Sequence, residues 1–257
     1  MSDTNKRPPV ERRKQPRSHE IVPGDHAGAE TLELLAAAPQ YNRWQFDMVA
    51  PYLGRRILEV GAGIGNMSAL FLETHPELLV ATDTDPYYRA RLEERFAGRS
   101  DVAVEELHLP DPGAPGRLGR FRLDTVIATN VVEHIEDDLG TAITMRELLA
   151  PGGRAIILVP ALQGIYGELD RELGHHRRYN RPRLALLMER AGLRVERMLW
   201  FNRVGVFGWW FNGRIRRTRM IPLEQLRTFD RMVPMLRLER LLPLPFGQSL
   251  IAVGRAP

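Results

Sequence analysis

The run Ile57-Leu58-Glu59-Val60-Gly61-Ala62-Gly63-Ile64-Gly65-Asn66 contains the strongest local signal in the chain. An apolar segment ends beside an acidic residue, glycines then occupy alternate positions, and residues 67–73 have the composition of a helix. The first glycine lets the chain turn at the end of a strand, and the next two remove side chains that would hold a ligand away from the backbone. This order predicts a nucleotide-type site. The dinucleotide fingerprint G-x-G-x-x-G, however, needs glycine at position 66, where this chain has asparagine.

Length and composition indicate one globular domain. With 257 residues, of which 44% are hydrophobic and 26% charged, the chain can bury one good core, and we expect a single domain over residues 28–257. No apolar run reaches the roughly 18–20 residues that a membrane span needs. The sequence has no cysteine, which excludes disulfides, thiolate metal sites and a cysteine nucleophile and agrees with a cytoplasmic location.

Residues 1–27 are polar, basic and proline-containing, and we expect them to form a disordered basic tail. A solvated tail and a contact with an anionic surface both fit this composition. The net charge of the whole chain is +4, but nearly all its basic residues are arginines spread among acidic residues. We therefore do not expect nucleic acid as the partner.

Short apolar segments alternate with helical ones after the glycine turn. Strands that alternate with helices predict a parallel, doubly wound α/β sheet, in which ligands bind at the carboxyl ends of the strands. The turn Pro151-Gly152-Gly153 is expected to precede the fifth strand. The later strands are predicted at 78–82, 102–104, 124–129, 155–159, 194–201 and 248–253, and the helices at 29–53, after Pro86, at 138–149 and at 182–191.

Asp83 ends the second predicted strand. A carboxylate at this point can accept hydrogen bonds from both ribose hydroxyls of a nucleoside. The alternative is that it caps the next helix, but Asp85, directly before Pro86, suits that capping role better. We therefore predict that Asp83 is a ribose ligand.

Four features in this order resemble the class I S-adenosylmethionine (SAM)-dependent methyltransferases of the small-molecule, type 11/12-like kind. They are the glycine turn preceded by Glu59, Asp83, the segment 129–138 and the Pro-Gly-Gly turn. The resemblance covers about residues 41–200. It implies a Rossmann-like, seven-stranded, mostly parallel sheet with an antiparallel last strand. It also implies SAM as cofactor and S-adenosylhomocysteine (SAH) as product.

Two absences refine this expectation. The segment after the fourth strand is not the Pro-Pro-aromatic motif of enzymes that methylate exocyclic amines of nucleobases or glutamine, which argues against that branch. No His/carboxylate cluster has metal-ligand spacing in the sequence, so we expect no metal.

The resemblance also assigns residues to the cofactor site. Asn130 would lie against the methionine part of SAM, largely through its backbone, and Tyr41 would close over the sulfonium, as cation–π attraction favours. Packing explains Tyr41 equally well and explains Trp44 better, and a structural role is favoured for His134. The predicted cofactor-binding residues are Tyr41, Glu59, Gly61, Ala62, Gly63, Gly65, Asp83, Thr84, Glu106, Leu107 and Asn130, with Glu105 and His108 competing with Glu106 for the place beside the adenine.

Residues 161–181 form the predicted substrate loop, because they follow the fifth strand and are glycine-rich and then densely polar. The loop is similar to a Gly-His-x-Arg-Arg-Tyr segment of bacterial methyltransferases that act on small molecules. A hydroxyl or amine acceptor must lose a proton, and an imidazole suits that role near neutral pH. His175 and His176 are the candidate catalytic bases, and since neighbouring residues point in different directions we expect one of them to enter the site.

Arg177, Arg178 and Tyr179 are predicted to bind the substrate, the two arginines by clamping a carboxylate or phosphate. The alternative is that residues 170–172 and Arg177 form a surface network that only holds the loop.

Residues 202–246 form a long insert before the last strand. Its first part, 205–220, is aromatic and then arginine-rich, and 223–242 mixes apolar and basic residues at helical spacing. The favoured interpretation is a helical cap over the substrate cleft or a homodimer contact. The alternative is an amphipathic surface that touches a membrane peripherally and admits a lipid-linked substrate.

Together these features predict a methyltransferase that moves the SAM methyl group to a small-molecule acceptor. Oxygen is the favoured acceptor atom, and a sugar, lipid or natural product is the favoured type of substrate. The enzymatic alternative is the transfer of another SAM-derived group in the same pocket. The non-enzymatic alternative is a SAM-binding or nucleic-acid-binding module without turnover.

Overall fold

The computed structural model describes residues 36–216, 222–241 and 244–257. The expected tail, 1–27, and the expected helical start at residue 29 lie outside these ranges. The first described long helix, α2, covers Pro39–Val49 and is followed by a 3-10 turn over Ala50–Tyr52.

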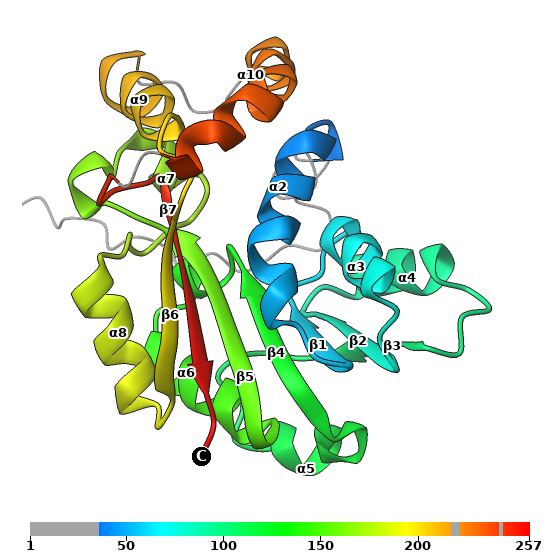
Figure 1. The fold of residues 1–257 in the computed structure, drawn as a ribbon. Coiled ribbons are helices and arrows are strands. Elements are labelled where there is room, and N and C mark those ends of the chain that lie inside the picture. Colours follow the sequence, from blue (N-terminus) through cyan, green and yellow to red (C-terminus); the bar gives the residue numbers. More distant parts are fainter. Residues whose placement is uncertain (1–35, 217–221, 242–243) are drawn as a thin grey trace, which may run out of the picture.

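Seven strands form one sheet in the order β3-β2-β1-β4-β5-β7-β6 (Figure 1). The pairs among the first five strands are parallel, whereas β7 is antiparallel to both of its neighbours. The expected fold class is confirmed. The strands are β1 Arg56–Val60, β2 Leu78–Asp83, β3 Val102–Glu106, β4 Leu123–Thr129, β5 Leu149–Pro160, β6 Arg194–Phe201 and β7 Ser249–Arg255.

The Pro-Gly-Gly segment lies inside β5, so the prediction of a turn ahead of the strand is wrong. The β4–β5 register shifts between the pair Leu123/Leu149 and the pair Thr125/Arg154, and the extra residues of β5 are accommodated between these pairs. Gly152 there has φ +75°, a conformation that favours glycine. The segment therefore makes the β4–β5 pairing irregular, but it does not end the strand.

Helices cover both faces of the sheet because successive strand residues point to opposite faces and both sets are apolar. Residues such as Leu58 and Ile157 pack with α5, α6 and α8 on one face, and Ile57 and Ile156 pack with α2, α3, α4 and α10 on the other. The bounds are α3 Asn66–Phe71, α4 Pro86–Arg95, α5 Ala114–Leu118, α6 Asp138–Glu147, α8 Arg181–Arg190 and α10 Leu223–Leu236.

The remaining elements gather at the carboxyl edge of the sheet. The segment after β4 contains the 3-10 helix η4, Val132–His134, and the loop after β5 contains η5, Gln163–Ile165, and α7, Glu168–Glu172. The insert consists of α9, Gly205–Trp210, the π-helical turn η6, Phe211–Arg216, α10 and η7, Arg237–Leu241.

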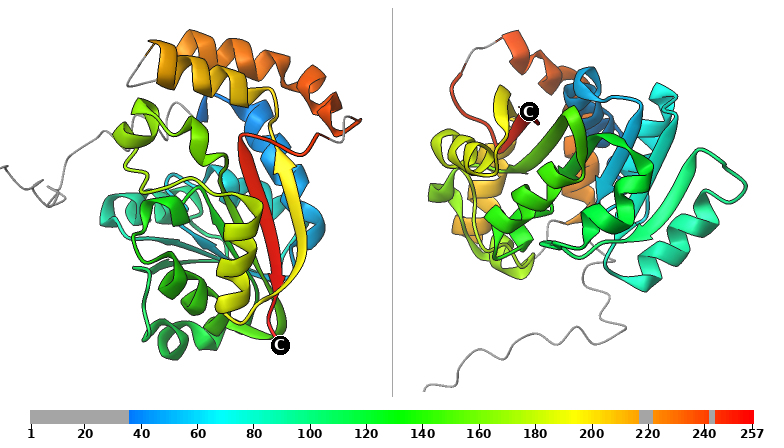
Figure 2. Two further views of the ribbon diagram at one scale, coloured as in Figure 1. Left: turned by 90° about the vertical axis from the view of Figure 1, so that its left-hand side faces the viewer. Right: turned by 90° about the horizontal axis from the view of Figure 1, so that it is seen from below.

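The insert stands above this edge and joins two parts of the fold (Figure 2). Its first half, α9 and η6, packs on η5 and α7 of the loop after β5, whereas α10 packs on α2 (Figure 1). The insert therefore packs on both the loop after β5 and α2, and its role as a cap over the substrate cleft stays a prediction.

Asp230 of α10 caps the first turn of α2. Its Oδ1 accepts the Tyr41 backbone N–H at 2.8 Å and its Oδ2 accepts the Gln40 backbone N–H at 3.3 Å. The residue at the N-cap of α2, Ala38, offers no side-chain acceptor. A residue 190 positions away thus satisfies donors that the helix itself leaves unpaired.

We expect Asp230→Ala to lower the free energy of unfolding by about 1–2 kcal/mol, because two N–H groups at the start of α2 lose their acceptor. Urea denaturation measures the change. Asp230→Asn is the matched control: its side-chain oxygen can still accept the Tyr41 N–H, so its loss should be smaller. Equal losses for the two variants would contradict the capping role.

Candidate functional site at the carboxyl edge of the sheet

The glycine turn after β1 is tightly packed against other segments. Gly61, Gly63 and Gly65 have φ values of +66°, +54° and +78°, respectively. A Cβ on Gly61 would lie 2.7 Å from Val131 Cγ2, and one on Gly65 would lie 2.9 Å from Leu92 Cδ2. Glycine at position 65 is thus needed for the contact with α4, a reason that differs from the ligand clearance expected from the sequence.

Glu59 is buried behind the turn. It is 3% exposed, and its Oε2 accepts a hydrogen bond from Ser68 Oγ of α3. Burial raises the pKa of Glu59 to about 8, and the hydrogen bond from Ser68 offsets only part of this effect. At neutral pH the group is mostly protonated in the described structure, and a nearby cationic ligand group would favour its ionised form.

Asp83 at the end of β2 is joined directly to the glycine turn. Its Oδ2 accepts the Gly63 N–H at 2.9 Å and its Oδ1 accepts the Asp85 N–H at 3.0 Å. Each oxygen retains capacity for a further hydrogen bond, which is what two ribose hydroxyls need. Asp85 in turn accepts the Tyr87 N–H at 2.8 Å and caps α4, as predicted.

The β2–β3 register places Glu106 opposite Asp83. The Glu106 carboxylate is exposed and contacts His108 Nε2 at 2.8 Å, and that hydrogen bond lowers its pKa. Glu105 instead pairs with Arg120, so Glu106 is the acidic residue of β3 beside the ribose candidate. Leu107 is buried and Thr84, after Asp83, is exposed.

Asn130 begins the segment after β4 with φ +53°, which asparagine tolerates better than most residues. Its N–H donates to Leu158 O of β5 at 2.9 Å. The next residue, Val131, is the one that approaches Gly61. The segment and the glycine turn are therefore in direct contact, as the shared strand ends require.

Tyr41 on α2 packs among aromatic side chains. Its ring centroid lies 5.5 Å from that of Phe201 and 5.8 Å from that of Phe229. Burial raises the pKa of Tyr41 to about 12, and its hydroxyl hydrogen-bonds to Asn202. Trp44 is 4% exposed and packs on Phe201, which confirms the packing role predicted for it.

The loop after β5 is held by the buried carboxylate of Asp170. This carboxylate binds His175 Nδ1 at 2.9 Å and Arg178 Nε at 2.7 Å through Oδ1. Its Oδ2 accepts the Trp209 Nε1–H at 3.1 Å and the Gly167 N–H at 3.0 Å. Because Asp170 is fully buried, the expected surface network at residues 170–172 is wrong. The carboxylate instead joins the loop to α9.

The three residues predicted to bind substrate are engaged inside the protein. Arg178 is 1% exposed, donates to Ala161 O at 2.7 Å and lies over the Trp209 ring at 4.7 Å. Tyr179 is fully buried and donates to Asp138 Oδ2 at 2.9 Å. Arg177 donates to the backbone carbonyls of Ile135 and Glu136 at 3.0 and 2.8 Å. These contacts fix the loop against the segment after β4, so the predicted substrate clamp is not what the geometry presents.

The two candidate bases differ in their surroundings. His175 is 9% exposed and its Nε2 lies 4.0 Å from Glu133 Oε1. His176 is exposed, and its backbone N–H donates to Glu133 O at 2.8 Å. The ring of His134 stands edge-on to that of His175, with centroids 4.7 Å apart. Of the two, His175 is therefore the one whose ring lies beside Glu133, and its role as a base stays a prediction.

The fold brings Glu133, His134 and His175 together, and their ligand-capable atoms all lie within 4.8 Å of one another. We call this group the His–Glu cluster. The sequence pattern gave no sign of this cluster, because residues 133–134 and 175 are far apart along the chain. Glu133 and Asp170 are also the residues that sequence reasoning missed, and a charged residue in a loop gives no sign that it is buried.

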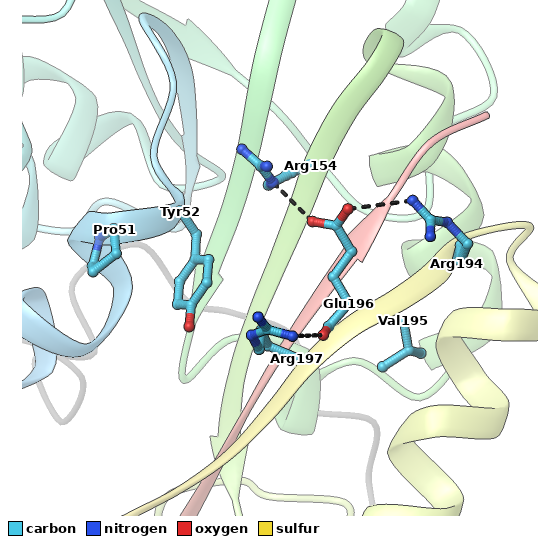
Figure 3. A pocket seen from close by; sticks show the side chains of 7 residues that line it. All are labelled: Pro51, Tyr52, Arg154, Arg194, Val195, Glu196 and Arg197. Atoms are coloured by element: carbon cyan, nitrogen blue, oxygen red, sulfur yellow. Dashed lines mark hydrogen bonds and ion pairs between the residues drawn. The ribbon is translucent and has the colours of Figure 1, made fainter.

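A surface hollow lies at the opposite edge of the sheet, lined in part by Tyr52, Arg154 and Glu196 (Figure 3). It is lined by the start of β6 and by Arg154 near the start of the regular part of β5. Within it Glu196 binds Arg154 at 3.0 Å and Arg194 at 3.4 Å, and these arginines lower its pKa. The charges are already paired and the hollow is remote from the glycine turn, so it is not the candidate site.

Comparison with known proteins relates the middle of the chain to methyltransferases. Residues 58–155 match a family described as a methyltransferase domain. A highly reducing polyketide synthase of Strobilurus tenacellus is 28% identical over 137 residues, 51% of this chain and 4% of the synthase. A tRNA U34 carboxymethyltransferase of Chromohalobacter salexigens is 27% identical over 128 residues, 47% of this chain and 38% of that enzyme. The chain thus spans only a part of these curated relatives.

Solved structures share the fold over nearly the whole chain. A SAM-dependent methyltransferase from Archaeoglobus fulgidus superposes with a TM-score of 0.59 at 16% identity, covering 90% of this chain and 100% of that one. A chain from the complex between the Haloferax volcanii Trm112 methyltransferase activator and a methyltransferase gives a TM-score of 0.61 at 15% identity, covering 92% and 98%. These similarities cover a larger share of the chain than residues 58–155 do.

We expect Glu59→Gln to change how stability depends on pH. The folded protein raises the pKa of Glu59 from 4.5 to about 8 and so binds its proton more tightly than the unfolded chain. This contribution is fully present below pH 4.5 and is lost as the pH rises to about 8, by at most about 1.4 kcal/mol per pH unit. The glutamine variant lacks this loss.

Urea denaturation at pH 5.5, 6.5, 7.5 and 8.5 checks this expectation. The free energy of unfolding of Glu59→Gln minus that of the wild type should increase with pH, and other titrating groups cancel in the difference. Parallel curves would show that Glu59 is ionised throughout.

Proposed function

We propose that this chain is a class I SAM-dependent methyltransferase that transfers the SAM methyl group to a small-molecule acceptor, on oxygen. The match of residues 58–155 to a methyltransferase domain supports this proposal. The observation that carries this proposal is the junction between the glycine turn and Asp83. There a buried carboxylate is held by the Gly63 N–H and keeps capacity for two further hydrogen bonds.

The cofactor side of the proposed site follows from this junction. Asp83 would accept the ribose hydroxyls, and Glu106 and Leu107 would flank the adenine at the adjacent strand end. Asn130 and the glycine turn would contact the methionine part, with Glu59 behind them. When bound, SAM supplies an electrophilic methyl group on a sulfonium, so the protein needs only to align the acceptor and receive its proton.

The acceptor side is proposed at the His–Glu cluster. It lies in the segment that begins at Asn130 and in the loop after β5, both at the carboxyl edge of the sheet. The acceptor oxygen would form a bond to the methyl carbon as the carbon–sulfur bond breaks, and its proton would leave at this cluster. Asp170 orients His175 for this task, which favours His175 over His176.

The curated relatives keep a second acceptor class open. One of them is named a tRNA U34 carboxymethyltransferase, so transfer of another group, or to RNA, is the alternative reaction. In this chain the described arginines are largely paired with carboxylates or backbone carbonyls, as at Arg43, Arg99 and Arg177, which favours a small molecule. A steep decrease of RNA affinity with salt would support the RNA alternative.

The insert is proposed to cap the acceptor side with its inner face. Trp209 points inward to Asp170, and Arg214 donates to Gly164 O at 3.2 Å. The outer face carries exposed apolar side chains next to Arg214 and Arg216, which favours contact with an anionic membrane surface. Phe207, Trp210, Phe211 and Ile215 are 65%, 46%, 47% and 56% exposed. Among the described residues, no helix combines the length and apolar character needed to span a bilayer.

We expect the wild-type protein to bind SAM and SAH at one site, and Asp83→Ala to weaken both by about tenfold or more, because two hydrogen bonds to the ribose are lost. Calorimetric titration measures the affinities. Asp85→Ala is the matched control, since that carboxylate caps α4 but does not contact the glycine turn. If folded wild-type protein binds neither ligand, the proposed function fails.

Turnover is tested by measuring SAH release with fractions of a cell extract. Small-molecule fractions are compared with fractions that contain RNA, and the latter are assayed with and without ribonuclease treatment. SAH formed from fractions that contain no RNA supports the small-molecule acceptor. SAH formed only when RNA is present supports the alternative. SAM binding without SAH release in any fraction supports a module without turnover.

We expect the wild-type protein to float with anionic liposomes and the triple variant Phe207→Ser, Trp210→Ser, Phe211→Ser to remain in the lower fractions. The variant leaves Trp209 in place, so the loop contacts persist. Leu186→Ser, which removes a side chain that is 54% exposed on α8, should float like the wild type. If none of the proteins floats, the membrane contact is contradicted. If the wild type also self-associates, a homodimer contact is favoured instead.

A further inference from the structure

The His–Glu cluster contains a buried carboxylate without a partner. Glu133 is fully buried, and neither of its side-chain oxygens has a hydrogen-bond partner within the described part of the chain. Buried polar groups are nearly always paired, since an unpaired one loses its contacts with water and gains nothing. The site therefore needs a proton or a cation at this carboxylate.

His175 faces Glu133 with a ring nitrogen that is ready to accept. Its other nitrogen, Nδ1, lies 2.9 Å from Asp170, a carboxylate that also binds Arg178 and Trp209. Asp170 thereby holds the proton on Nδ1 and leaves the Nε2 lone pair directed to Glu133 Oε1, 4.0 Å away. A carboxylate behind a histidine is the usual arrangement around metal-bound imidazoles.

His134 completes the group at its exposed end. Its ring is edge-on to His175, and one side of it hydrogen-bonds to the Leu173 backbone, which leaves the other ring nitrogen available. Glu133 is buried and His134 is exposed, so the cluster reaches solvent on one side. An ion and an acceptor can enter from that side.

We propose that Glu133, His134 and His175 bind a divalent first-row transition-metal cation. Donor atoms around such an ion lie about 2.1 Å from it, and therefore about 3.4 Å apart in a tetrahedral site. In the structure these atoms lie within 4.8 Å of one another, and small side-chain rotations would bring them to this spacing. Two imidazoles with one carboxylate suit zinc, cobalt, iron or manganese better than magnesium, which prefers oxygen ligands.

Three protein ligands leave at least one coordination position open, as in catalytic zinc sites. This step rests on the proposed function. The open position would take the acceptor hydroxyl, and coordination would lower the pKa of that hydroxyl so that its proton leaves to solvent. The oxygen then bonds to the methyl carbon, the carbon–sulfur bond breaks, and SAH departs. His175 is in this case a ligand and not the base itself.

Titration of Co²⁺ into tag-free, chelator-treated full-length protein tests the proposal, with the visible absorption of coordinated Co²⁺ as readout. We expect one site, displaced by Zn²⁺ and resistant to a hundredfold excess of Mg²⁺. Glu133→Gln, which keeps the side-chain volume, and His134→Asn, at the exposed end, should each weaken Co²⁺ binding at least about tenfold. His75→Asn, an exposed histidine in a left-handed turn outside the cluster, should bind Co²⁺ like the wild type.

The same proteins are titrated with SAM, so that the two proposals fail separately. Unchanged SAM binding with no Co²⁺ site in the wild type overturns the metal proposal alone. Equal Co²⁺ affinity in wild type, Glu133→Gln and His134→Asn, or displacement of Co²⁺ by Mg²⁺, also overturns it. If Glu133→Gln does not fold, His134→Asn decides. Loss of SAM binding in the wild type instead overturns the proposed function.

Discussion

The Asp170 carboxylate is a single buried charge that binds groups from two parts of the chain, the loop after β5 and α9. It holds the backbone of its own loop at Gly167, orients His175, neutralises Arg178 and accepts the indole N–H of Trp209. A buried ion pair of this kind gives little net stability, but removing one partner leaves an uncompensated charge. The loop after β5 and the insert therefore cannot rearrange independently, and the position of His175 depends on both.

The two halves of the proposed site are built differently. On the cofactor side the contacts are set by neighbouring parallel strands: β1 and β2 end together, so Gly63 and Asp83 meet without help from distant segments. On the acceptor side no strand end supplies the key groups. Glu133 and His175 lie in two different loops. Side chains such as Arg177 join these loops by bonding to residues about 40 positions away in the sequence. The first half depends on the order of the strands, and the second depends on how the loops pack together.

This difference explains what the sequence could predict. Strand β6, Arg194–Phe201, was predicted at its observed bounds, and the junction at Asp83 followed from glycine spacing and strand ends, because both are local patterns. The burial of Arg178 and the meeting of Glu133 with His175 could not be predicted, since they depend on which loops pack together. A charged residue is predicted to be exposed unless its partner is known, and here only the fold brings the partners together.

The insert gives the last connection between the halves. Through Asp230, α10 caps α2 beside the proposed cofactor side, and through Trp209, α9 binds the loop on the proposed acceptor side. One segment thus contacts elements on both sides of the proposed site, while its outer face is apolar and exposed at Phe207. Anything that binds that outer face, a bilayer or a second copy, acts on a segment that already touches both halves. If acceptor and cofactor bind as proposed, both would lie next to the insert, because the insert packs on α2 and on the loop after β5.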